Sequence, residues 1–258
     1  MRDGRRGLRP SREDGDDRDS EGLPVDASAE FCYTSAMRRF LSERNLIDAV
    51  MLSALVTALS IGRFVHLGTS LPVYIPLTML CMTFVGGAVS AWGRCAGMPG
   101  IVTDKRTLGL GSALAALVAL IALPVSVVWT DPRLRAALAK ATDPSFLERC
   151  FPSILGGKLS LVLWSAGFET LFFIAAPASL VARLTNRRDV AVGVCVLLRA
   201  FVVHRQLCAG AIGEPTWLFF TAAMVPAAVG SILFARFGLV PAMVFAACMD
   251  AHVFVGGR

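Results

Sequence analysis

Long apolar runs dominate the chain from residue 46 onward, and short polar segments separate them. A helix of about 20 apolar residues is long enough to cross the hydrocarbon core of a bilayer. The runs therefore predict an all-α fold, a polytopic helical membrane bundle with about seven transmembrane spans. The expected spans cover residues 46–67, 71–92, 108–129, 159–180, 190–207, 215–237 and 239–255.

The segments before the first span have a different composition. Residues 1–30 carry six Arg and nine Asp or Glu with almost no large apolar side chains, which is typical of a disordered tail. Residues 31–45 mix aromatic and basic side chains, which favours an interfacial amphipathic helix on an anionic membrane face. The expected organisation is a disordered cytoplasmic tail at 1–30, an interfacial helix at 31–45 and a transmembrane bundle at 46–258. A further amphipathic helix is expected on the membrane surface within the loop 130–158.

Composition and charge agree with a membrane location. The chain is 55% hydrophobic and 17% charged, whereas a soluble domain carries about 25% charged residues. The net charge of +6 comes from dispersed basic residues without interleaved exposed aromatics, so the sequence predicts no nucleic-acid partner. Basic residues of the short loops gather on one side of the predicted bundle: Arg38, Arg39, Arg44, Arg94, Lys105, Arg106, Arg183, Arg187, Arg188 and Arg236. This bias predicts an integral protein of the cell (inner) membrane with a cytoplasmic N-terminus.

Three polar residues interrupt the later apolar runs. Glu169 lies near the middle of the fourth span, His204 in the fifth and Asp250 in the seventh. A carboxylate at that depth costs roughly 2.5–3.5 kcal/mol on insertion scales, so it is a candidate functional residue. With a helical rise of about 1.5 Å per residue, all three lie roughly 15–20 Å along their spans, within one layer of the expected bundle.

A glutamate, a histidine and a second carboxylate at one depth are suited to activating water. A buried Glu can act as a general base and a His can relay the proton. The seven Cys form no CxxC pair, and the three His form no HExxH motif, so the sequence predicts neither a metal nor a cofactor. The pattern therefore favours metal-free hydrolysis.

Three stretches also resemble the motifs of the CPBP family, the CAAX prenyl proteases and bacteriocin-processing endopeptidases. GFETLFFIA is similar to the first motif, a Glu-Glu pair followed by two apolar residues and Phe-Arg-Gly. LLRAFVVH is similar to the second motif, which ends in His. ILFARFGLVPAMVFAACMDA is similar to the third, in which a Gly-Leu turn leads into a helix bearing His and, four residues on, Asn or Asp. The resemblance covers residues 159–255.

The resemblance implies an intramembrane endopeptidase that hydrolyses peptide bonds of membrane-associated peptides or proteins. Glu169 and His204 would activate water, and Asp250 would orient the substrate or stabilise the oxyanion. The chain departs from the motifs at Thr170, Ile174, Ala200 and Ala246, which stand where the family has the second Glu, the Arg, an aromatic residue and the third-motif His. A catalytically inactive membrane scaffold or regulator that binds partner helices is therefore the alternative function, and a small transporter is a third.

Each candidate residue also has a structural interpretation. Glu169 could be the counter-charge of Arg199 on the fifth span, and Asp250 could be a polar group between packed helices. His204 could be an interfacial histidine beside Arg205. His252 stands about 200° round a continuous helix from Asp250, so the sequence excludes it from the site. The sequence leaves the substrate and the oligomeric state open.

Overall fold

The computed structural model describes residues 43–99, 101, 104–141, 145–210 and 216–255, all of which belong to one compact unit, Ala36–Arg258. The predicted tail at 1–30 lies outside these residues, as does the predicted interfacial helix apart from residues 43–45, which already belong to the first span. The described residues contain helices and no strand, so the predicted all-α fold is confirmed.

Six of the helical segments are long and apolar enough to cross a membrane, and a shorter apolar segment, Leu239–Val255, follows them. They correspond to the seven predicted spans, and they indicate a membrane protein. The helices, in chain order, are α2 Glu43–His66, α3 Leu71–Cys95, α4 Lys105–Val125, η1 Ser126–Thr130, α5 Asp131–Leu138, α6 Ser145–Cys150, α7 Leu155–Trp164, η2 Ser165–Ala175, α8 Ala176–Thr185, α9 Arg188–Gly210, α10 Thr216–Phe237, α11 Leu239–Asp250 and α12 His252–Val255.

The helix that contains the third span continues beyond residue 129, the predicted end of the span. α4, η1 and α5 follow one another without a break from Lys105 to Leu138. The last of them, α5, carries Asp131, Arg133 and Arg135 and lies where the sequence predicts the start of an amphipathic surface helix. A second short helix, α6, follows in the same loop.

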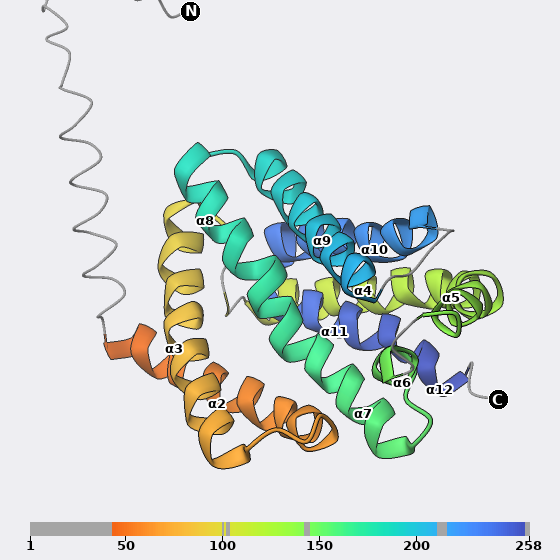
Figure 1. The fold of residues 1–258 in the computed structure, drawn as a ribbon. Coiled ribbons are helices and arrows are strands. Elements are labelled where there is room, and N and C mark those ends of the chain that lie inside the picture. The colour runs from red at the N-terminus through yellow and green to blue at the C-terminus, as the bar shows by residue number, and fades with distance from the viewer. Residues whose placement is uncertain (1–42, 100, 102–103, 142–144, 211–215, 256–258) are drawn as a thin grey trace, which may run out of the picture. The chain divides into compact units, whose positions relative to one another are not determined.

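Helix α11 lies at the centre of the bundle. It packs against α4, α10, η2 and α7, as Figure 1 shows. Apart from Asp250 at its end, its residues are apolar on every side, which is expected of a helix surrounded by other helices. Phe245 of α11, Leu171 of η2 and Phe234 of α10 belong to one buried hydrophobic cluster.

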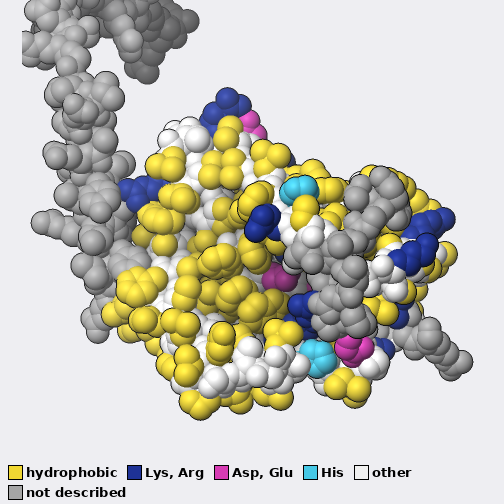
Figure 2. Space-filling model, viewed as in Figure 1, with side chains coloured by type: hydrophobic (Ala, Val, Ile, Leu, Met, Phe, Trp, Pro, Cys, Tyr) yellow, Lys and Arg dark blue, Asp and Glu magenta, His cyan; other side chains and the backbone are white. Residues whose placement is uncertain are grey.

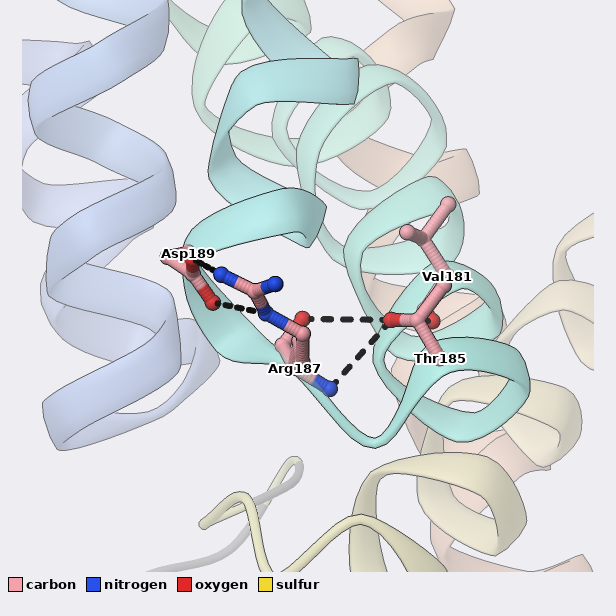
Figure 3. Close-up of polar contacts among 4 residues, drawn as sticks. All are labelled: Val181, Thr185, Arg187 and Asp189. Atoms are coloured by element: carbon pink, nitrogen blue, oxygen red, sulfur yellow. Dashed lines mark hydrogen bonds and ion pairs between the residues drawn. The ribbon is translucent and has the colours of Figure 1, made fainter.

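Tight turns join α8 to α9 and α10 to α11. Asn186 ends α8 in the left-handed conformation, with φ of 53°. The Arg187 amide donates a hydrogen bond of 3.2 Å to the Thr185 hydroxyl oxygen, and the Arg187 guanidinium pairs with Asp189 at the start of α9 (Figure 3). Gly238, with φ of 95°, is the single residue between α10 and α11. A side chain would strain that backbone.

Candidate functional site

The segment that carries Glu169 is wider than an α-helix. Residues Ser165–Ala175 form η2, whose backbone hydrogen bonds join residues five apart. The Thr170 hydroxyl likewise donates to the carbonyl of Ser165, at 2.9 Å. Residues five apart are about 140° apart on an α-helix, but the wider turn brings Ser165 and Thr170 to one face. π-helical turns inside α-helices are frequent at functional sites.

A proline follows each of the two wide segments. η1 ends two residues before Pro132, and η2 ends two residues before Pro177. Proline lacks an N–H, and its ring clashes with the carbonyl four residues earlier in an α-helix. A wider turn before the proline relieves this clash, so the two prolines give a physical reason for both segments. Both segments also line the cavity described below.

Glu169 forms an ion pair with Arg199 of α9. The Arg199 Nη2 atom lies 3.1 Å from Glu169 Oε2, and the two side chains are 28% and 27% exposed. The Arg199 guanidinium also lies over the Phe173 ring, 5.7 Å from its centroid. The structural interpretation of Glu169 as the counter-charge of Arg199 is therefore confirmed as a contact. The contact leaves a catalytic role open, because a paired carboxylate can still face a substrate.

Asp250 lies on the same cavity as Glu169. Ser165, Glu169, Arg199 and His252 line the cavity as well, and the charges of the last three act on the Asp250 carboxyl group. Two of the three residues predicted from the sequence are thus brought together by η2 and α11.

His204 lies outside this group. It is exposed on α9 and does not line the cavity, and its ring lies 3.7 Å from the Cys208 sulfur. The angle between residues on helix α9 explains this position. Arg199 faces Glu169, and a residue five positions further along an α-helix is turned by about 140°. The expected meeting of His204 with Glu169 and Asp250 is therefore not observed.

His252, which the sequence excludes, lines the cavity instead. Helix α11 ends at Asp250, Ala251 is a turn residue and α12 begins at His252. The angle of 200° holds for a regular α-helix, whereas Ala251, with φ of −60° and ψ of −13°, forms a tighter turn between the two helices. The sequence also gives no reason to select Asp131, which lines the cavity from the start of α5.

His252 and Asp131 form a pair within the cavity. The His252 Nδ1 atom lies 2.7 Å from the carbonyl of Met249, and its Nε2 atom lies 3.7 Å from Asp131 Oδ1. Because Nδ1 faces a carbonyl oxygen, it carries a proton and donates it. Nε2 then carries a proton only when the ring is an imidazolium cation. In that form the His252 ring and the Asp131 carboxylate attract each other.

These residues line a cavity of about 610 Å³. Its lining is mostly apolar and comes from α4, η1, α5, η2, α9, α10, α11 and α12. The charged and titratable residues on it are Asp131, Glu169, Arg199, Asp250 and His252. Acidic and basic side chains lie among hydrophobic ones on the face shown in Figure 2. Ligand sites have this character, a volume of roughly 300–1,000 Å³ with a few polar groups on apolar walls.

The departures from the CPBP-like motifs have distinct environments. Thr170 is buried, and its hydroxyl is used within η2. Ala246 lines the cavity one helical turn before Asp250. The position of the third-motif His therefore opens onto the cavity but carries no polar group.

No protein-family model, curated protein or solved structure matches this chain. Across the described part of the chain, no group of three or more His, Cys, Asp or Glu could hold a metal ion. The arrangement can accept and donate protons through Glu169, Asp250 and His252, and it can offer guanidinium N–H groups from Arg199.

Proposed function

We propose that this chain is a membrane-embedded hydrolase of the CPBP type that cleaves peptide bonds of membrane-associated peptides or proteins. The observation that carries the proposal is that Glu169, Asp250 and His252 line one cavity with apolar walls. Each of these groups can exchange a proton, and low-dielectric walls strengthen electrostatic interactions with a reacting group.

In the proposed reaction, Glu169 removes a proton from a water molecule while the oxygen of that water attacks the substrate carbonyl carbon. The proton then passes to the leaving amine as the C–N bond breaks. His252 takes the proton-relay role that the sequence assigned to His204, since its ring is on the cavity. Asp250 orients the substrate.

The oxyanion needs a donor that Ala246 cannot supply. Arg199 has five N–H bonds, and its Nη2 atom donates to Glu169 Oε2 at 3.1 Å. A remaining N–H group would stabilise the developing negative charge. Loss of one oxyanion donor typically costs about 10²–10³ in rate, so we expect Ala246→His to raise cleavage by adding a donor one turn from Asp250.

The second candidate function is a non-catalytic relative that binds partner helices. The observation favouring it is the Glu169–Arg199 pair, because the carboxylate already has a charged partner at 3.1 Å that joins η2 to α9. In that case Glu169 and Arg199 hold η2 to α9, and the cavity is a by-product of helix packing. For either function we place the protein in the inner membrane with a cytoplasmic N-terminus, on the bias of its basic loop residues.

The test must separate the effect of losing the Glu169 carboxylate from the effect of losing its ion pair with Arg199. Glu169→Gln alone would leave Arg199 without its counter-charge, so a loss of cleavage could reflect misfolding. Two variants that both lack the pair solve this problem: Arg199→Gln retains the carboxylate, and the double variant Glu169→Gln/Arg199→Gln does not. We expect Arg199→Gln to keep some cleavage of a model membrane peptide and the double variant to have none.

His204→Gln is the matched control, because this histidine lies outside the cavity. It should cleave as the wild type does, whereas His252→Gln should lose activity. Equal cleavage by Arg199→Gln and the double variant would refute a role for Glu169 in catalysis. A wild-type protein that is folded but does not cleave the peptide would favour the non-catalytic function.

A further inference from the structure

The cavity opens sideways between α4 and α10. Ile121 and Val125 of α4 and Val225 of α10 line it, yet these residues are 68%, 60% and 60% exposed. A residue that is exposed and also lies on the cavity wall marks an opening of the cavity. Both helices belong to segments long and apolar enough to cross a membrane, so this opening faces the hydrocarbon core of the bilayer.

Helices α4 and α10 approach each other at both ends of the opening. Near the start of α4, a Cβ atom added to Gly111 would lie 2.7 Å from the Cβ atom of Phe237, the last residue of α10. At the other end, the ring centroids of Trp129 and Trp217 are 5.8 Å apart. An apolar groove lies between these two contacts. Its lining includes Val118, Ile121, Ala122, Val125, Val225 and Val229.

The groove has the length of one bilayer leaflet. Val118 and Trp129 are eleven positions apart, which is about 16 Å along a helix that rises about 1.5 Å per residue. One leaflet contributes about 15 Å of the roughly 30 Å hydrocarbon core. Tryptophan is enriched where the hydrocarbon core meets the lipid headgroups. The Trp129–Trp217 pair therefore marks this boundary at one end of the groove.

A cation lies beside the tryptophan pair. The Arg133 guanidinium is 4.7 Å from the centroid of the Trp129 ring, and it donates a hydrogen bond of 2.7 Å to the Trp129 carbonyl oxygen. Arg133 is exposed, and this hydrogen bond uses one of its five N–H bonds, so the others can donate to an anion. Arg135 adds a second positive charge to α5, with its guanidinium over the Phe151 ring.

The acidic residues nearest to Arg133 along α5 and α6 face other groups. Asp131 is 3% exposed, and its Oδ1 atom faces His252. Glu148 of α6 accepts hydrogen bonds from the amide and the hydroxyl group of Ser153. Among the residues that the structure describes, Arg133 therefore has no acidic partner. The groove and this cation together fit a molecule that carries a hydrocarbon chain and a phosphate.

We propose that a phospholipid occupies the groove, with one acyl chain between α4 and α10 and its phosphate accepting hydrogen bonds from Arg133. The acyl chain packs against the apolar wall, and the guanidinium and the phosphate form charge-assisted hydrogen bonds. Basic sites beside transmembrane helices bind lipid headgroups in this way. This site goes beyond the proposed hydrolase, because lipid binding requires no cleavage.

The test is a titration of the full chain in maltoside micelles with dioleoylphosphatidylglycerol, with the bound lipid counted by native mass spectrometry. We expect the first phosphatidylglycerol to bind more tightly than those that follow. Dioleoylglycerol has the same acyl chains without the phosphate and should displace it poorly. Arg133→Gln removes the cation and should weaken binding about three- to tenfold, the range of a charge-assisted hydrogen bond that water also reaches.

Val225→Trp fills the groove. It should weaken binding more than about tenfold, because several methylene groups of the acyl chain would lose their contacts. Each variant has a matched control on α9, outside the cavity lining. Leu197→Trp puts the same side chain at an exposed position, and Arg205→Gln removes an exposed cation. Both controls should bind phosphatidylglycerol as the wild type does.

Equal displacement by dioleoylglycerol and phosphatidylglycerol in the wild type would overturn the proposal, because the phosphate would then contribute nothing. This result does not depend on folding of a variant. Unchanged affinity in folded Arg133→Gln or folded Val225→Trp would overturn it as well. Tight lipid binding without peptide cleavage would refute the hydrolase alone, and peptide cleavage without tight lipid binding would refute this inference alone.

Discussion

Replacing Arg199 with Gln removes the guanidinium that faces Glu169 and leaves a carboxylate that is 27% exposed without its partner. Glu169→Gln does the reverse and leaves the guanidinium alone. The double variant removes both charges and keeps two side chains of similar length that can hydrogen-bond. The structure therefore predicts that the double variant loses less free energy of unfolding than the two single variants lose together.

The magnitude follows from the geometry. Two unit charges 3.1 Å apart attract by about 5 kcal/mol at an effective dielectric constant of about 20. Desolvation of both groups offsets most of this attraction. Breaking a fully buried pair costs about 3–5 kcal/mol, and an exposed pair contributes about 0–1 kcal/mol. For side chains about one quarter exposed, we expect each single variant to lose about 1–3 kcal/mol and the pair to show a coupling energy of at least about 1 kcal/mol.

The assay is reversible unfolding of wild type, both single variants and the double variant in mixed micelles, monitored by helical circular dichroism. The coupling energy is the difference between the double change and the sum of the single changes. The exposed Arg187–Asp189 pair provides the control cycle, because solvent screens it. It should show no coupling beyond experimental error.

Additive single changes would refute the reasoning. In that case the Glu169–Arg199 contact would hold no net free energy, and neither its structural role nor the design of the cleavage test would stand. A stabilising Arg199→Gln would have the same meaning. It would show that burial of the guanidinium costs more than the pair returns.

Three further predictions concern packing, thiol chemistry and pH. Gly111→Ala should destabilise the protein by about 1–3 kcal/mol in the same unfolding assay, because the added Cβ would lie 2.7 Å from Phe237 Cβ; Gly109→Ala, with nothing within 4 Å, should not. Burial raises the pKa of the Cys150 thiol, so maleimide should label Cys150 more slowly than exposed Cys208 at neutral pH, and equal rates by peptide mass spectrometry would contradict this. The Thr107 side chain and amide lower the pKa of Asp104; the carboxylate therefore stabilises α4 at pH values above the ordinary Asp pKa, and the destabilisation by Asp104→Ala should decrease as the pH falls below that pKa and the carboxylate takes up a proton.

The sequence alone determined that the spans are helices and where they lie along the chain. Twenty apolar residues in a row can satisfy their backbone groups in a membrane only as a helix, so local composition was sufficient for seven segments. It was also sufficient to select Glu169 and Asp250, because a carboxylate in an apolar run is rare and costly. The Gly238 turn between α10 and α11 followed from the same local rules.

The tertiary structure decided which polar groups meet. Depth along the spans grouped Glu169, His204 and Asp250 but did not fix the direction in which each side chain points. His252 lies on the cavity after the turn at Ala251, and the rotation of α9 turns Arg199 toward Glu169 and His204 outward. Pro132 and Pro177 are local signals of the wide turns, but the shared cavity depends on how α4, η2 and α11 pack. Depth along a helix is a one-dimensional property of sequence, whereas the direction of a side chain depends on every turn before it and on the neighbouring helix.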